Sequence, residues 1–300
     1  MTVRVGVPDA DMCARILPRI GDDVELIVWR PNDEPFEGEL DLLVIPYVVS
    51  YELLAGLPRG IKHIQSQSLG YDGAADFVPT GTTFSNAVGV HEAPAAEIAM
   101  ALILASQRGW PEVGRNQSAE LWDRKRWPGL IGQRVLLIGV GGIGHEFEKR
   151  VSGFDVHLTR VASRARDDIH SMGDLKALLP GADIVVLALP LVDETRGLVD
   201  DAFLDLLPHG ALIVNVSRGA IVDTDALVRH VRAGSVRSAL DVVDPEPLPH
   251  GHPLWSLPGS LLTPHLGGNV QSMLDRIDPL VIAQINRLRA GQTPDHIVIS

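Results

Sequence analysis

Hydrophobic residues in the first third of the chain fall into short runs separated by stretches long enough to form helices. Four runs rich in apolar and β-branched residues are each long enough for one strand: 3–7, 24–29, 42–46 and 61–66. Strands that alternate with helical spacers are typical of a parallel sheet with crossover helices. This part of the chain therefore predicts an α/β unit.

A second and longer series of strand-like runs follows, again with helical spacers between them: 135–139, 156–159, 184–189, 211–216, 238–242 and 261–263. Between the two series, residues 95–107 are rich in alanine and apolar on most faces, which predicts a buried helix that passes from one unit to the other. Leu, Ile and Val recur at helical spacing in residues 272–290, so this segment is expected to return the chain to the first unit.

Two domains are therefore expected, and a chain of 300 residues is long enough for both. The smaller one comprises residues 1–95 and 284–300, and the larger one residues 96–283. Both are interpreted as doubly wound parallel-sheet domains, with a cleft between them. The larger one would bind the cofactor and the smaller one the substrate.

Charge and cysteine content narrow the classes of partner. The 26 Lys and Arg residues against 38 Asp and Glu residues give a net charge of −12, which repels a phosphate backbone, so no nucleic-acid partner is expected. The single cysteine, Cys13, excludes an internal disulfide and a cysteine-based metal site, and fits a reducing, cytoplasmic location. The apolar runs are too short for a transmembrane helix, and no metal or membrane partner is expected.

A glycine-rich turn follows the first strand of the second series. Gly139, Gly141 and Gly144 fit the pattern G-x-G-x-x-G, with Gly142 and Ile143 between them, and helix-compatible residues follow. Glycines here allow a tight turn, close approach of the backbone to a pyrophosphate and close packing of helix on strand. The alternative is an ordinary strand-to-helix turn. The strand before the motif and the helix after it favour a Rossmann dinucleotide-binding domain.

Basic residues occupy the position where an NAD-specific site has an acidic residue. This position lies about 20 residues beyond the first glycine, and Arg160 stands there, followed by Ser163 and Arg164. Guanidinium groups bind phosphate through paired, charge-assisted hydrogen bonds, so the two arginines and the serine suit a ribose 2′-phosphate. The sequence therefore predicts a preference for NADP(H), with NAD(H) as a possible cofactor. The alternative is a solvated basic loop.

Three charged residues follow consecutive strands of the larger unit, in the order Arg218, Glu246 and His265. Ligand sites in parallel α/β sheets form at the carboxyl ends of strands. Reduction of a 2-oxo acid requires a cation, an acid that protonates the developing alkoxide, and a group that orients this acid. Arg218, His265 and Glu246 would supply these in turn. Each alone has an ordinary structural explanation, such as a surface ion pair, so the prediction depends on their joint occurrence.

With these motifs, the chain resembles the D-2-hydroxyacid dehydrogenases of the glyoxylate/hydroxypyruvate reductase and phosphoglycerate dehydrogenase type. The resemblance covers nearly the whole length, and the matching segments are 139–144, 189–190 with 194–197, 215–219, 241–247, 252–255 and 263–268. It implies a flavodoxin-like smaller domain, with Arg218 binding substrate and Glu246 and His265 forming the acid–base pair. Backbone N–H groups of Leu69 and Gly70 would bind the substrate carboxylate.

The resemblance also implies further cofactor contacts and an assembly. Asp241 would hold the nicotinamide carboxamide, and the other residues expected at the cofactor are Leu189, Pro190, Thr195, Val216, Ser217 and Gly267. Residues 109–127, which include Trp110, Trp122 and Trp127, lie where members of the family place an arm that packs on a second subunit. A homodimer is therefore expected, with burial of the tryptophans within one chain as the alternative.

Several functions remain open. The leading one is NAD(P)H-dependent reduction of a small 2-oxo acid, such as glyoxylate or hydroxypyruvate, to the D-2-hydroxy acid. Oxidation of phosphoglycerate, another 2-hydroxy acid or phosphite is compatible with the same three residues. The resemblance argues against formate, because formate dehydrogenases of the same superfamily lack the partner that Glu246 would provide. A cofactor-sensing protein of the corepressor type would retain the same motifs without turnover.

Overall fold

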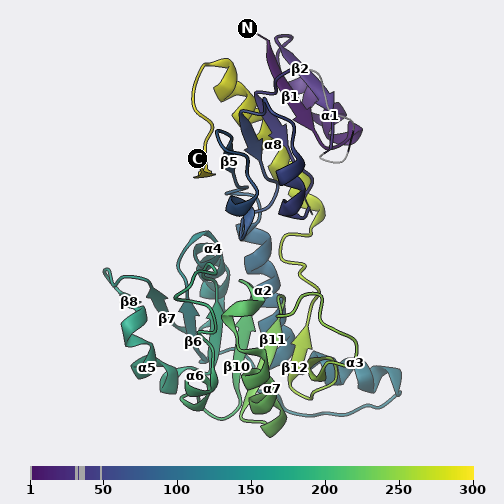
Figure 1. Cartoon of the computed structure of the whole chain (residues 1–300). Coiled ribbons are helices and arrows are strands. Elements are labelled where there is room, and N and C mark those ends of the chain that lie inside the picture. The colour runs from purple at the N-terminus through teal and green to yellow at the C-terminus, as the bar shows by residue number, and fades with distance from the viewer. Residues whose placement is uncertain (1, 31–32, 34–37, 48) are drawn as a thin grey trace. The chain divides into compact units, whose positions relative to one another are not determined.

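The computed structural model describes residues 2–30, 33, 38–47 and 49–300. The chain divides into two compact units. Unit 1 consists of Met1–His91 with Gln271–Ser300, and unit 2 consists of Glu92–Val270. Figure 1 shows both units with many of their helices and strands labelled. The two-unit α/β architecture predicted from the sequence is confirmed.

Unit 1 contains a six-stranded sheet in the order β13-β5-β4-β3-β1-β2. Its strands are β1 (Val3–Val7), β2 (Val24–Val28), β3 (Leu42–Val44), β4 (His63–Gln65), β5 (Thr83–Ser85) and β13 (Ile297–Ile299). Five strands are parallel, and β13 pairs with β5 in the antiparallel direction. The order of the parallel strands, with β2 on one side of β1 and β3 on the other, is that of flavodoxin-like folds.

Both faces of this sheet are covered. Alternate apolar side chains of β1 pack with helices α1 (Ala10–Ile16) and α8 (Leu274–Arg289) on one face. The opposite face packs against short 3₁₀ helices, η2 (Tyr51–Gly56) and η3 (Ala74–Asp76). Side chains alternate between the faces of a strand, so buried strands covered on both sides become apolar at nearly every position. The apolar runs found in the sequence are explained in this way.

Unit 2 contains a seven-stranded parallel sheet in the order β12-β11-β10-β9-β6-β7-β8. Its strands are β6 (Arg134–Ile138), β7 (His157–Ala162), β8 (Ile169–Ser171), β9 (Ile184–Leu187), β10 (Ala211–Asn215), β11 (Val236–Leu240) and β12 (Ser260–Leu262). From β6 the chain continues to one side and then returns to the other, so the strand order reverses between β6 and β9. Ligands of this fold bind at the carboxyl ends of strands near that reversal.

Helices cover both faces of the sheet in unit 2. The helices are α2 (Glu92–Gln107), α3 (Trp110–Ser118), α4 (Gly142–Val151), α5 (Leu175–Leu178), α6 (Asp201–Asp205) and α7 (Thr224–Ala233). Val135 and Leu137 of β6 pack with α2 and α4, whereas Leu136 and Ile138 pack toward the face covered by α5, α6 and α7. The predicted Rossmann architecture is thus present in unit 2.

The domain boundaries differ from the predicted ones. The chain enters unit 2 at Glu92 rather than at residue 96, because α2 begins there and packs along its length within unit 2. It returns to unit 1 at Gln271 rather than at residue 284. The predicted cut would divide α8, a continuous helix whose Ile277 and Ile285 lie in the same core as β1.

Three strands were not predicted: β5, β8 and β13. Each is only three residues long. The end of the chain, for example, forms β13 by pairing with β5, which is distant in the sequence. Strands this short leave no periodic pattern in the sequence.

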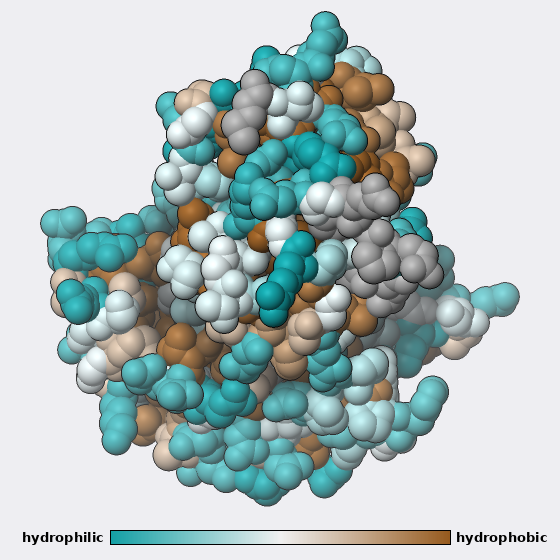
Figure 2. Space-filling view, turned by 45° about the horizontal axis from the view of Figure 1, so that its top comes forward, coloured by the Kyte–Doolittle hydropathy of each residue, from teal (hydrophilic) through white to brown (hydrophobic). Residues whose placement is uncertain are grey.

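The surface is mixed in character. Figure 2 shows, on the face in view, small groups of hydrophobic residues among hydrophilic ones. No helix in the described part of the chain has the length and apolar character that a membrane span requires.

Candidate active site

The glycine loop, residues 139–144, connects β6 to α4 at the carboxyl end of the sheet in unit 2. Gly139 has a φ of +103°, and a Cβ atom on it would lie 2.2 Å from the carbonyl oxygen of Ala188. A Cβ atom on Gly144 would lie 2.1 Å from the carbonyl oxygen of Gly139. Side chains at these two positions are thus excluded by the backbone conformation and by close packing.

The loop also leaves room where a ligand would approach. A Cβ atom on Gly141 would meet no atom of the chain within 4 Å, and Gly141 caps the amino end of α4. N–H groups at a helix amino end and the helix dipole together favour bound phosphate. The glycines of this loop therefore leave space that fits the pyrophosphate of a dinucleotide. The cofactor contacts expected of Gly139, Gly141, Gly142, Ile143 and Gly144 stay a prediction.

Polar side chains connect the ends of the neighbouring strands β9 and β10. Ser217 Oγ donates to the carbonyl oxygen of Leu187 at 2.7 Å and accepts from the N–H of Leu189 at 3.0 Å, which joins the ends of β9 and β10. Thr195 Oγ1 donates to the carbonyl oxygen of Pro190 at 2.7 Å. The hydroxyl groups of Ser217 and Thr195 thus hold loops at the carboxyl edge, and Val216 is buried beside them.

Arg160 was expected at the end of a strand, but the structure places it elsewhere. It lies inside β7, two residues before the strand ends at Ala162, and opposite Leu137 of β6. Its Nη1 atom donates to Oε1 of Glu148 at 2.7 Å, and Nη2 forms an ion pair with Asp168. Spacing along the sequence does not reveal these two acids. They come from α4 and from the turn after β7, so only folding brings them together.

Ser163 and Arg164 directly follow β7 and are both exposed. A residue after the end of this strand is where the Rossmann fold recognises the adenosine ribose. Of the three residues expected at the ribose phosphate, Ser163 and Arg164 therefore lie at the position that recognises the ribose, whereas Arg160 lies inside the strand.

His265 and Glu246 form a hydrogen-bonded pair at the other half of the same sheet. Nδ1 of His265 lies 2.6 Å from Oε1 of Glu246. His265 follows β12, and Glu246 follows β11, so two adjacent strands supply the pair. The side chains are 47% and 41% exposed, which leaves the imidazole accessible to a substrate. The predicted pairing is present.

The pair has the electrostatics of an acid that stays charged near neutrality. The hydrogen bond to Glu246, opposed by burial and supported by the carboxylate charges of Glu246 and Asp241, raises the pKa of His265 above its ordinary value of 6.5. The same hydrogen bond lowers the pKa of Glu246 below its ordinary value of 4.5. Both shifts favour an imidazolium beside a carboxylate.

Arg218 follows β10 and brings a positive charge to the same end of the sheet. Its charge lowers the pKa of both Glu246 and His265, so it lies within electrostatic range of the pair. Asn215 donates to the carbonyl oxygen of Arg218 at 2.9 Å, and Nη1 of Arg218 donates to the carbonyl oxygen of Ser217 at 2.7 Å. The three predicted catalytic residues are thus grouped at the carboxyl edge of unit 2.

Asp241 organises the loop that carries His265. Its Oδ1 atom accepts from Thr263 Oγ1 at 2.6 Å and from the N–H of Leu266 at 2.8 Å, and its Oδ2 atom accepts from the N–H of Gly267 at 2.8 Å. Asp241 is 3% exposed. A carboxylate has about four acceptor sites, so these three bonds leave capacity for another donor. No motif in the sequence indicates this supporting role.

In unit 1, the loop that contains Leu69 and Gly70 has its carbonyl groups fixed by side chains. Asn86 Nδ2 donates to the carbonyl oxygen of Leu69, and Tyr51 Oη donates to that of Gly70, both at 2.8 Å. Within the described ranges, the N–H groups of Leu69 and Gly70 have no recorded acceptor. The loop thus presents N–H groups, as an anion-binding nest requires.

Comparison with known proteins agrees with this geometry. The family model described as "D-isomer specific 2-hydroxyacid dehydrogenase, NAD binding domain" matches residues 100–267, more than half of the chain. The matched segment contains the glycine loop, Arg218, Glu246 and His265.

Two relatives match over most of this chain. Glyoxylate reductase of Thermofilum pendens is 30% identical over 291 residues, which cover 90% of this chain and 85% of that protein. D-3-phosphoglycerate dehydrogenase of Methanocaldococcus jannaschii is 31% identical over 299 residues. That alignment covers 95% of this chain and 56% of the relative, so the chain spans little more than half of the phosphoglycerate dehydrogenase.

A solved structure shows the same fold. The D-isomer specific 2-hydroxyacid dehydrogenase of Xanthobacter autotrophicus Py2, crystallised with NADPH and MES, is 25% identical, with a TM-score of 0.82. The comparison covers 99% of this chain and 98% of that chain. Motifs, site geometry and relatives all lead to one assignment: the chain belongs to the D-isomer-specific 2-hydroxyacid dehydrogenase family.

Proposed function

We propose that the protein reduces a small 2-oxo acid, of the glyoxylate or hydroxypyruvate type, to its D-2-hydroxy acid with NADPH as the preferred cofactor. Family membership makes it an NAD(P)-dependent oxidoreductase. The observation that carries the proposal is the 2.6 Å pair between His265 and Glu246, with the charge of Arg218 nearby. This arrangement supplies a cation and an oriented acid for a carbonyl group.

The roles of the three side chains follow from their chemistry. A bound nicotinamide ring would supply the hydride that adds to the carbonyl carbon of the substrate. Arg218 binds the substrate's negative oxygen atoms through its guanidinium group. Because Nδ1 of His265 is engaged by Glu246, Nε2 is the atom that donates a proton to the carbonyl oxygen. In the direction of oxidation, the same nitrogen accepts the proton from the hydroxyl group.

The preference for NADPH is supported by Ser163 and Arg164, which are exposed directly after β7. Arg164 would bind the ribose 2′-phosphate, whereas Arg160 is engaged by Glu148 and Asp168 and would need to exchange at least one of these partners. The crystal structure of the Xanthobacter relative is a complex with NADPH. The carboxylate of the substrate is proposed to bind the N–H groups of Leu69 and Gly70.

Turnover of a panel of 2-oxo acids with both nicotinamide cofactors tests the proposal. Glyoxylate or hydroxypyruvate should be reduced with NADPH, and the kcat/KM for NADPH should exceed that for NADH about tenfold, as charge-assisted hydrogen bonds to a phosphate imply. The variant Arg164→Ala should lose this preference, and Arg166→Ala serves as the matched control. Equal use of both cofactors by the wild type would refute the NADPH assignment.

The alternative functions predict different results in the same assay. Strong activity on D-3-phosphoglycerate with weak reduction of glyoxylate would favour the phosphoglycerate dehydrogenase reading, which the relative from Methanocaldococcus jannaschii supports. Tight cofactor binding without turnover of any 2-oxo or 2-hydroxy acid would favour a cofactor sensor. Reduction that is lost in His265→Ala, with cofactor binding intact, supports the enzyme.

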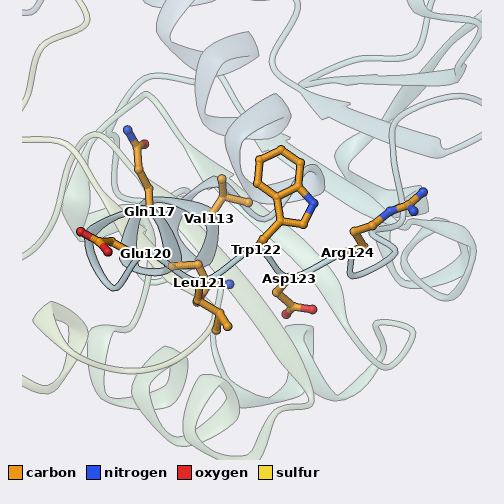
Figure 3. A pocket seen from close by; sticks show the side chains of 8 residues that line it. Val113, Gln117, Glu120, Leu121, Trp122, Asp123 and Arg124 are labelled. Atoms are coloured by element: carbon orange, nitrogen blue, oxygen red, sulfur yellow. The ribbon is translucent and has the colours of Figure 1, made fainter.

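We also propose that a second copy of the chain covers the arm formed by α3 and the segment after it. Trp110 is 68% exposed and Trp122 is 92% exposed. Val113, Leu121 and Trp122 help to line a pocket of about 480 Å³ between helix and segment (Figure 3). Apolar groups exposed to this extent usually mark an interface. Light scattering should show a dimer, and Trp122→Glu should shift it to the monomer.

The single cysteine supports the proposed cytoplasmic location.

A further inference from the structure

Glu92 is a buried carboxylic acid that contacts the glycine loop from outside the motif. It is the first residue of α2 and is 8% exposed. A Cβ atom on Gly142 would lie 2.6 Å from Cγ of Glu92 and 3.2 Å from its Oε1 atom. The side chain of Glu92 therefore occupies the space beside Gly142 that a side chain at that position would need.

Gly142 is also the first residue of α4, so the carboxyl group of Glu92 lies at the amino end of this helix. The first turn of α4 contains no acidic residue of its own, and its basic residues Lys149 and Arg150 are in the last turn. A helix amino end stabilises negative charge, whether it comes from a side chain or from a ligand. Glu92 thus supplies an internal anion where the pyrophosphate of a dinucleotide is expected to bind.

The proposed reaction has no role for this carboxylate. His265 and Glu246 provide the acid and its partner, and Arg218 provides the cation, all from the ends of β10, β11 and β12. Glu92 comes instead from α2, which packs against α4. Its negative charge opposes that of a pyrophosphate in a region partly shielded from solvent, where charge interactions are stronger than in water.

We propose that Glu92 sets the affinity for the dinucleotide by electrostatic opposition to its pyrophosphate. This inference rests on the proposed binding of a nicotinamide dinucleotide at the glycine loop. The carboxylate stabilises the amino end of α4 in the free protein and weakens binding of the incoming phosphates. Glu92 is accordingly a residue that makes the cofactor easier to release, not one that recognises it.

Isothermal titration calorimetry with three probes tests this role. NADPH and ADP both contain a pyrophosphate group, whereas adenosine has no phosphate. The variant Glu92→Gln should bind NADPH and ADP about tenfold more tightly than the wild type, the size expected for charges several ångströms apart near a protein surface. Binding of adenosine should not change. The gain for ADP should shrink at higher ionic strength.

Glu97→Gln is the matched control, because Glu97 lies on the same helix, carries the same charge and is exposed. A second variant, Glu92→Ala, removes the charge together with the rest of the side chain and leaves the glycine loop unchanged. It should show the same gain for ADP, and it keeps the test decisive if Glu92→Gln does not fold.

Three results would overturn the inference: unchanged or weaker binding of ADP in both Glu92 variants, the same gain in Glu97→Gln, or an equal gain for adenosine. Failure of the wild type itself to bind NADPH, NADH or ADP would instead overturn the proposed function. The two failures are therefore distinguishable.

Discussion

Replacement of Gly219 by alanine should inactivate the enzyme while leaving the cofactor site intact. The added Cβ atom would lie 1.9 Å from the carbonyl oxygen of Val243 and 2.6 Å from the backbone nitrogen of Asp244. An ordinary contact requires about 3.4 Å or more, so the two segments must separate by about 1.5 Å. The atoms in conflict belong to the backbone, so no side-chain rotation can relieve the clash.

This separation acts on the catalytic residues directly. Arg218 immediately precedes Gly219, and Glu246 lies three residues beyond Val243 on the other segment. A displacement of about 1 Å in a catalytic group can lower the rate about 100-fold, and we expect a loss of at least that size in kcat. Gly139 and Gly144 lie in a different loop, so the Kd for NADPH should stay within about threefold of the wild-type value.

Steady-state reduction of the best 2-oxo acid, with the Kd for NADPH measured separately, provides the assay. Gly153→Ala is the control, because a Cβ atom there meets no atom within 4 Å and the residue is distant in sequence from the site. A folded Gly219→Ala variant with kcat within threefold of the wild type would refute the reasoning.

Three further predictions concern support of the site, stability and cofactor choice. Asp241→Asn places an amide N–H₂ group against N–H or O–H donors, so we expect a loss of about 1–3 kcal/mol in the free energy of unfolding, measured in urea, together with a lower kcat. Burial lowers the pKa of His63 to about 4 from its ordinary value of 6.5, so the unfolded chain takes up a proton that the folded chain excludes as pH falls from about 6.5 to 4. Relative to His63→Asn, the wild type should therefore lose about 3 kcal/mol of stability over this range, and parallel pH profiles would contradict the assignment. Asp168→Asn removes one partner of Arg160 and should raise the preference for NADPH about fivefold or less, because exposed ion pairs contribute about 0.2–1 kcal/mol. A preference that falls in this variant would show that Asp168 does not compete with the ribose phosphate.

The parallel strands could be predicted from the sequence because most are buried on both faces and therefore consist of apolar runs. In β6, for example, Val135 and Leu136 pack on opposite faces of the sheet, so the pattern does not depend on which face is considered. The strand β13 could not be predicted in this way. It is three residues long and forms by pairing, as the edge strand, with β5, which is distant in the sequence.

The same distinction applies to the candidate site. Arg218, Glu246 and His265 could be found because each follows a strand, and parallel strands place their carboxyl ends along one edge. Residues that act through helix packing left no such signal. Glu148 reaches Arg160 from α4, and Glu92 reaches Gly142 from α2, so neither contact follows from spacing along the chain.

Titration of His265 itself tests its acid–base role most directly. Histidine NMR resonances can be followed against pH in the wild type and in Glu246→Gln, with His265→Gln used to assign the signal. The pKa of His265 should lie above 6.5 in the wild type and should fall in Glu246→Gln, because the hydrogen bond to Glu246 is the largest cause of the upward shift. A pKa at or below 6.5 in the wild type, or one that is unaffected by Glu246→Gln, would contradict the proposed mechanism.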